Sequence, residues 1–290
     1  MSADSAPAQV RLDPRTALAR ALSAATYEIL PFGRAEEPVL AHVPRTVGLT
    51  VTATEARGLG PTIDLAVRLA GHGYTVAPHL AARLVRDERE LKDMVAQLGE
   101  GGVDGVFVVG GDAVRPAGPF PDALSLLEAL DGHPFARVGI AGHPEGHGGI
   151  PRTVIDRALE EKAPHATHIV TQLCFDARTT AGWARGLPAR SVGLPVMVGL
   201  PGVVSRQRLV RVTARLGLGP SARFLRKQQS LFWRFLLPGG YRPGRLAARL
   251  APYLAEPGTG LSGLHLFTFN ELAATEAWRR RLLERLGGAA

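Results

Sequence analysis

The chain has 290 residues, 46% of them hydrophobic and 21% charged, an ordinary composition for a globular protein that can bury a large core. Its single cysteine, Cys174, excludes an intrachain disulfide and a zinc–cysteine cluster, and fits a reducing compartment. No run approaches the ~18 consecutive apolar residues that span a bilayer, and Met1–Pro14 lacks the apolar stretch of a signal peptide. We therefore expect a cytoplasmic protein with no membrane partner.

The net charge of +8 suits an anionic partner. The basic residues are mostly scattered arginines, apart from Arg279–Arg281 and the group Arg223, Arg226 and Lys227. This scatter favours a solvated basic surface over nucleic-acid binding, and such a surface also attracts an anionic small molecule. We expect no nucleic-acid partner, and the sequence indicates no particular oligomeric state.

Eight short runs rich in Val, Ile and Leu, without polar alternation, predict parallel strands that are buried on both faces. These runs are Thr26–Leu30, Thr46–Val51, Tyr74–Leu80, Gly105–Val109, Val138–Gly142, His168–Phe175, Leu194–Leu200 and Leu264–Phe269.

Amphipathic stretches follow most of these runs and predict helices. They are Pro61–Ala70, Asp87–Leu98, Pro121–Leu130, Val154–Lys162, Ala177–Arg185, Arg206–Leu216 and Leu272–Leu286, and the expected N-caps are Asp87, Ser205 and Asn270. The link Phe32–Arg45 looks too short for a full helix, and the long stretch Gly202–Gly263 holds two helical patterns broken near Pro238.

A strand followed by a helix, repeated eight times, predicts an α/β protein with a (β/α)8 TIM barrel, and an open doubly wound sheet is the alternative. We expect a single barrel domain over residues 1–290, in which residues 1–20 form a loosely ordered N-terminal extension.

Polar residues gather where the predicted strands end, which is where barrels of this kind place their active sites. They are Glu28, Thr50, His79, Asp112, His143, Glu145, His147, Gln172, Asp176, Thr268 and Asn270. Glu28 stands out because an unpaired carboxylate costs several kcal/mol when it is buried. It is either ion-paired or functional, and we favour function.

Each of these residues also has a structural interpretation. Asp112 could cap a helix, His79 could be a satisfied core histidine, and Gln172 could face the helices instead of the lumen. The alternating His143, Glu145 and His147 could hold a metal ion, but Pro144 and Gly146 interrupt them where the strand should end. We expect no metal site.

Six short motifs follow one another along the predicted barrel, from Tyr27 toward the C-terminus. They are Tyr27–Pro31, Ala77–Leu80, Gly110–Asp112, Pro144–His147, Lys162 with Val170–Asp176, and Leu264–Glu271. In this order and at these barrel positions, they make the chain resemble methylenetetrahydrofolate reductases.

The resemblance implies that Glu28 is a general acid. It protonates the bound folate, so that the five-membered ring of 5,10-methylenetetrahydrofolate opens to an iminium, and hydride addition then gives 5-methyltetrahydrofolate. The resemblance also implies that Asp112 and Gln172 hold the pterin, and it makes Asn270 a further substrate contact. A carboxyl group shielded from water keeps its proton more readily, as such an acid requires.

The family usually carries FAD, and the resemblance leaves six residues as possible cofactor contacts, namely Thr50, His79, Gly111, His143, His147 and Lys162. Other family positions differ, since an arginine is replaced by Gly110, a tyrosine by His143, an asparagine by Ala158 and a glycine-rich segment by Thr52–Gly60. Loss of a guanidinium and a stacking ring weakens flavin binding. We therefore expect direct hydride transfer from NADH, or NADPH, without FAD.

Three other functions stay open at this point. The chain could catalyse the same reaction with FAD, or it could be a non-catalytic folate-binding relative. It could also transfer a methyl or methylene group without redox chemistry, for which Cys174 would be the only thiol. The presence of Glu28 speaks against a purely binding role.

Overall fold

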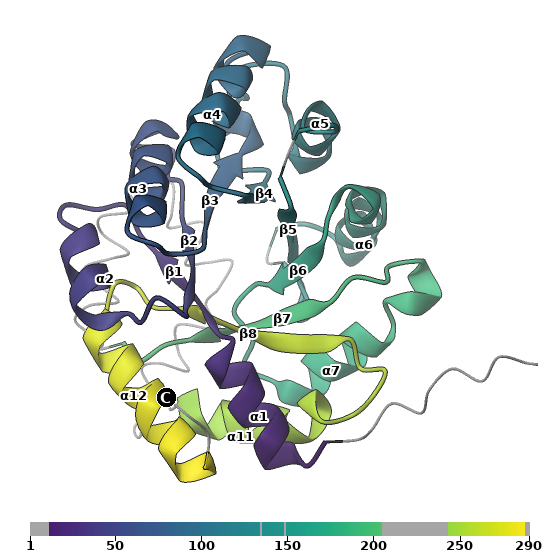
Figure 1. Ribbon diagram of the computed structural model, residues 1–290. Helices are drawn as coiled ribbons and strands as arrows, with labels where there is room; N and C mark the ends of the chain where they lie inside the picture. Colours follow the sequence, from purple (N-terminus) through teal and green to yellow (C-terminus); the bar gives the residue numbers. More distant parts are fainter. Residues whose placement is uncertain (1–11, 134, 148, 205–242, 288–290) are drawn as a thin grey trace, which may run out of the picture.

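The computed structural model describes residues 12–133, 135–147, 149–204 and 243–287. Eight parallel strands close into a barrel in which each strand pairs with the next one along the chain and β8 pairs with β1. Helices surround this barrel (Figure 1). The prediction of a (β/α)8 barrel is confirmed.

The strands lie close to the predicted runs. They are β1 (Thr26–Ile29), β2 (Gly48–Val51), β3 (Val76–Ala81), β4 (Gly105–Val109), β5 (Arg137–Gly142), β6 (His168–Thr171), β7 (Val196–Pro201) and β8 (Leu261–Phe267). Two predicted runs were too long at their ends. β6 ends at Thr171 and not at Phe175. At this point the Thr171 hydroxyl, and not a backbone carbonyl of β6, accepts the hydrogen bond from the backbone N–H of Gly199 on β7. β8 ends at Phe267, because Phe269 has a left-handed backbone with a φ of 51°.

Apart from α1 and α2, the described helices outside the barrel lie in stretches where the sequence pattern predicts helix. The helices are α1 (Pro14–Ser23), α2 (Glu36–His42), α3 (Gly60–Gly71), α4 (Glu88–Glu100), α5 (Ala123–Ala129), α6 (Arg152–Lys162), α7 (Ala177–Arg185), α11 (Pro243–Leu254) and α12 (Leu272–Leu286). Asp87 caps α4 as predicted, since its carboxylate accepts from the backbone N–H of Glu90. The predicted helix Arg206–Leu216 and its cap Ser205 lie outside the described residues. Within the described part of the chain, no helix is long and apolar enough to cross a membrane.

Two predictions about the N-terminal region were wrong. The link Phe32–Arg45 does hold a helix, α2, because Pro38 falls in its first turn, where a missing backbone N–H costs nothing. The extension at residues 1–20 is not loose throughout, because α1 begins at Pro14 and packs on α11 and α12 (Figure 1). Ala17 and Leu18 of α1 are buried there.

Asn270 is not the cap of α12. The N-cap position is Glu271, and no side chain caps this helix. The Asn270 amide instead pairs with the backbone of Leu30, accepting from its N–H and donating to its carbonyl, both at 2.9 Å. Asn270 adopts a φ of 58°, a conformation that asparagine tolerates better than most residues. It therefore joins the ends of β8 and β1.

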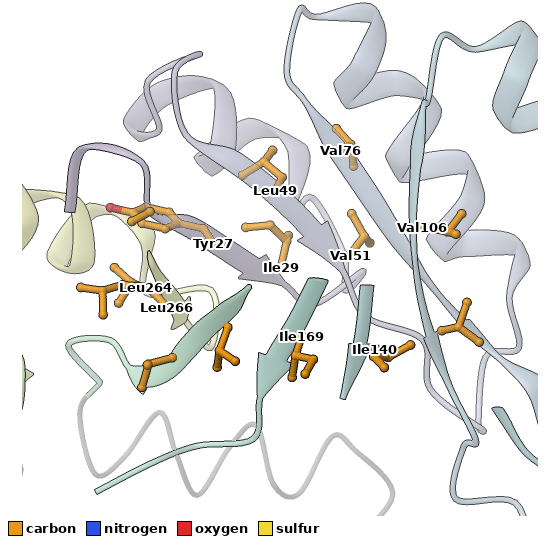
Figure 2. Packing of buried hydrophobic residues seen from close by; sticks show 14 of the residues in the cluster. Tyr27, Ile29, Leu49, Val51, Val76, Val106, Ile140, Ile169, Leu264 and Leu266 are labelled. Atoms are coloured by element: carbon orange, nitrogen blue, oxygen red, sulfur yellow. The ribbon is translucent and has the colours of Figure 1, made fainter. Parts of the chain in front are cut away.

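The strands present two different faces. Alternate side chains such as Tyr27, Ile29 and Leu49 point away from the barrel axis and pack against the helices (Figure 2). Cys174 is buried in the same layer, just after β6, with Sγ 3.1 Å from the Thr171 hydroxyl. Burial raises the pKa of the Cys174 thiol to about 11.

A buried polar network ties β1 to α12 and α1. The Tyr27 hydroxyl donates to Glu276 Oε2 at 2.6 Å, and the Arg279 guanidinium donates to both oxygens of Glu276, at 2.8 and 2.9 Å. Arg279 also donates to the carbonyl of Leu22 at 3.1 Å. The buried Glu276 carboxylate is therefore paired and hydrogen-bonded, which offsets the desolvation that its burial costs.

Candidate functional site

Glu28 points into the barrel. Its neighbour Tyr27 faces the helices, so the alternation of a strand turns Glu28 toward the lumen. The Glu28 side chain is 15% exposed, and its carboxylate makes no hydrogen bond within the described chain. Its Oε2 lies 4.0 Å from Nε2 of His79 and 4.0 Å from Nε2 of His265. The structure thus places a partly accessible carboxylate between two imidazole rings.

The two histidines flank Glu28 on different strands. Strand register aligns Glu28 with Thr50 and Thr50 with Ala77, which precedes His79 by two residues on β3. On the other side of β1, His265 is aligned with Thr26, two residues before Glu28. His265 is the more buried of the two rings, since its side chain is 2% exposed and that of His79 is 11% exposed.

His79 is a buried, neutral ring. Burial lowers its pKa to about 4, although the nearby charge of Glu28 acts in the opposite direction. Its ring lies 4.7 Å from that of Phe107 on β4. His79 can therefore offer a ligand one donor or one acceptor, but not a positive charge, at neutral pH.

Three threonine hydroxyls follow Glu28 outward along β2 and the loop after it. The hydroxyls of Thr50, Thr52 and Thr54 are buried and have no hydrogen-bond partner within the described residues. Alternate positions share one side of a strand, so Thr50 lies on the Glu28 side of β2.

The loop after β4 is rigidly anchored at the mouth. The Arg83 guanidinium donates to the carbonyls of Pro121 and Ala113, and Arg83 N–H donates to the Gly110 carbonyl. Gly111 has a φ of 87°, and a Cβ there would lie 3.3 Å from Ala81 Cβ, so the turn requires glycine. Asp112 follows and is exposed. It does not cap α5, because the N-cap of that helix is Asp122.

The loop after β5 separates the three candidate metal ligands. Glu145 Oε1 accepts from the backbone N–H groups of Phe175 and Asp176, at 2.6 and 2.8 Å, so it clamps the β5 loop to the β6 loop. The rings of His143 and His147 pack edge to face, with centroids 5.5 Å apart. No group of three His, Cys, Asp or Glu side chains in the described chain is arranged to hold a metal ion.

This second group of side chains is rich in nitrogen. Burial, together with the charges of His147, Lys162 and Arg152, lowers the pKa of His143 to about 4. Burial also lowers the pKa of Lys162, against the attraction of the Asp122 carboxylate. Arg152 is engaged by Asp156 and by the carbonyl of Pro144.

The remaining two predicted substrate residues lie at strand ends. Gln172 follows β6, is half-buried, and its side-chain oxygen accepts from the backbone N–H of Leu173 at 2.8 Å. Its amide nitrogen stays available to a ligand as a donor. Both polar atoms of Asn270 serve the Leu30 backbone, so its amide retains one free N–H.

The structure therefore brings Glu28, Thr50 and His79 together in the lumen, and His143, His147 and Lys162 together beside β5. Sequence reasoning missed His265 and Thr26 as neighbours of Glu28. The signal was present, because His265 and Phe267 alternate along β8 in the phase that faces the lumen.

No family model matches this chain. Solved structures are similar to it in shape. The C-terminal domain of a protein assigned as a chitinase, from Desulfitobacterium hafniense DCB-2, has a TM-score of 0.53 and 11% identity, and the match covers 91% of this chain and 99% of that one. A protein assigned as a lyase/mutase, from Burkholderia cenocepacia J2315, has a TM-score of 0.45 and 16% identity over 93% of this chain and 85% of that one. At 11% identity, the likeness to the first of these structures shows the barrel fold alone.

Proposed function

We propose that this chain reduces 5,10-methylenetetrahydrofolate to 5-methyltetrahydrofolate, with hydride supplied directly by NADH or NADPH. One observation carries the proposal: Glu28 is a lumen carboxyl group whose side chain is 15% exposed and which has no Lys or Arg partner in the described chain. A carboxylate kept only as structure is normally paired, as Glu276 is. The motifs that resemble methylenetetrahydrofolate reductases support this choice of reaction.

The proposed chemistry uses Glu28 as the acid. Its proton goes to a ring nitrogen of the folate while the bond between that nitrogen and the methylene carbon breaks. The resulting iminium carbon accepts hydride from the nicotinamide, which is oxidised, and Glu28 then regains a proton from solvent. Asp112 and Gln172 have the hydrogen-bonding groups to hold the pterin edge at the mouth of the barrel.

A flavin fits this set of donors poorly. The guanidinium groups of Arg83 and Arg152 are used by the protein's own loops, and Gly110 offers no side chain. His143, with its pKa near 4, carries no charge at neutral pH. We assign Lys162, which lies near His143, to the phosphates of the nicotinamide cofactor. We therefore derive no step through FAD.

An absorbance spectrum of the purified protein, followed by NADH oxidation in the same cuvette, tests the proposal. We expect a colourless protein that oxidises NADH only when methylenetetrahydrofolate is present. A flavin spectrum with turnover would retain the reaction and overturn the direct transfer. Absence of turnover with either nicotinamide and with added FAD would overturn the reaction and favour a non-catalytic folate-binding protein.

A further inference from the structure

Beside Glu28 lies a second residue pair, His265 and Thr26, which no step above uses. His265 is 2% exposed, and its Nδ1 lies 2.7 Å from the Thr26 hydroxyl. Its Nε2 points toward Glu28, 4.0 Å from Oε2. The ring also packs edge to face on Phe267, with centroids 5.0 Å apart. His265 is therefore held in one orientation from two sides.

The distance between His265 and Glu28 shows that the two side chains are close but not hydrogen-bonded. At 4.0 Å, the two atoms are too far apart for a hydrogen bond, which needs about 2.7–3.2 Å. A hydrogen bond between them therefore requires the Glu28 carboxyl group to turn toward His265 about its side-chain torsions.

We propose that His265 is a positioning residue that holds the proton of Glu28 between turnovers. The inference rests on the proposed role of Glu28 as the acid. His265 is 2% exposed and too buried to touch the substrate, so it acts only through Glu28. The side chain of His79, in contrast, is 11% exposed, so a ligand would compete for it.

The hydrogen bond between His265 and Thr26 sets the tautomer of His265, on which this role depends. A neutral imidazole has one N–H and one lone pair. When Nδ1–H donates to the Thr26 hydroxyl, Nε2 presents its lone pair to Glu28 and accepts a hydrogen bond from the protonated carboxyl group. The opposite tautomer would direct an N–H at Glu28 and favour its ionised form. The proposal therefore requires the Nδ1–H tautomer.

The electrostatic surroundings of His265 are simple. Glu28 faces it from β1, while His79 on β3 and His168 on β6 lie near enough for their charges to interact with it. Burial lowers the pKa of both of these histidines to about 4, so they are neutral near pH 7. These two histidines therefore place no positive charge beside His265 near pH 7.

The test uses the full chain, labelled with ¹⁵N-histidine and ¹³C-glutamate, and needs no turnover for its first part. We expect the side-chain ¹⁵N shifts of His265 to report the Nδ1–H tautomer, and Thr26→Val to abolish that preference. The Glu28 carboxyl signal, identified by its loss in Glu28→Gln, should change at a lower pH in His265→Phe than in the wild type. His265→Gln, whose side-chain oxygen can accept the same hydrogen bond, should restore part of this difference.

The second part follows kcat/KM against pH. In His265→Phe the alkaline limb should move to lower pH by about one unit, a tenfold loss at the alkaline end. Thr167→Val is the matched control, because the Thr167 hydroxyl lies 3.0 Å from Nδ1 of His168. It should leave the pH profile in place and change only the melting temperature.

The outcomes separate this inference from the proposed function. An Nε2–H tautomer of His265, or a Glu28 titration that is the same in His265→Phe, would overturn the inference even if the enzyme turns over normally. A wild-type protein without turnover would remove the reaction, while the tautomer and the Glu28 titration would still decide whether His265 holds the proton.

Discussion

Two glutamates on opposite sides of β1 meet very different surroundings. Glu276 lies between the barrel and α12, where Tyr27 and Arg279 occupy its two oxygens. Glu28 is the next residue to Tyr27 in the sequence, yet among the described residues its carboxylate has two imidazole rings at 4.0 Å and no hydrogen bond. Within this part of the chain, one strand thus carries a satisfied polar network on its outer face and a carboxyl group without a hydrogen bond on its inner face.

The difference assigns a structural role to Glu276 and a functional role to Glu28. A buried carboxylate with all its hydrogen bonds made cannot easily give up or take a proton, and its removal damages the fold. A carboxylate without such partners adds little to stability and keeps its proton free for chemistry. The inner and outer faces of β1 should therefore respond in opposite ways to mutation.

The variant Glu28→Gln should show the largest loss of activity without a loss of stability. Loss of a general acid typically lowers turnover by roughly 10²–10⁴-fold, and we expect kcat to fall by that amount. Folate binding and the melting temperature should stay close to wild type, because the Glu28 side chain makes no hydrogen bond in the described chain. Steady-state kinetics and a folate titration measure the two effects. Wild-type turnover in this variant would remove Glu28 from the mechanism.

On the outer face, Arg279→Met should destabilise the fold and leave kcat of the folded protein unchanged. It leaves the Glu276 carboxylate buried beside Tyr27 alone, at an expected cost of about 3–5 kcal/mol in the free energy of unfolding. Denaturant titration measures this cost. The double variant Arg279→Met/Glu276→Leu is the control, since it removes the stranded charge and should recover much of the loss. If the single variant were as stable as wild type, the network would be dispensable.

Acid should weaken the protein through its buried histidines. His79, His143 and His168 have pKa values lowered to about 4 from 6.5, so the unfolded chain binds their protons first as the pH falls. Stability is therefore retained above about pH 6.5 and lost between 6.5 and 4, by up to ~1.4 kcal/mol per pH unit for each histidine. Unfolding measured across this range in His79→Gln should show a shallower slope. An unchanged slope would mean that His79 titrates normally.

Tyr27→Phe gives the smallest expected effect. Glu276 keeps both hydrogen bonds from Arg279, so the loss should be about 1 kcal/mol. Burial and the Glu276 charge raise the pKa of Tyr27, so wild-type stability should fall above pH 10, where the unfolded phenol ionises and the folded one does not. The variant should lose that part of the alkaline fall, which thermal unfolding at pH 8 and 11 can detect.

The sequence allowed the barrel to be predicted because eight buried parallel strands leave eight continuous apolar runs. It also identified the Asp87 cap, which depends only on neighbouring backbone. Asn270 was misjudged because its partner, Leu30, lies 240 residues away, and no local pattern reveals such a contact. For the same reason the sequence does not reveal the contact between His265 and Thr26. These residues are 239 positions apart in the sequence and come together only in the closed barrel.

The candidate site was predictable residue by residue but not as a geometry. Alternation and strand ends correctly placed Glu28, Thr50 and His79 on one side of the barrel. The spacing of His143, Glu145 and His147 could not show that Glu145 turns to the backbone of the β6 loop. The roles of Asp112, Gln172 and Lys162 stay predictions for experiment to test.

Cys174 has a practical consequence for the dynamics of the barrel. It is the only thiol of the chain, it is buried, and its pKa of about 11 leaves little thiolate at neutral pH. A thiol reagent can reach it only when the packing between β6 and β7 opens. The rate of labelling in the native protein therefore measures how often this side of the barrel opens locally, with and without bound ligand.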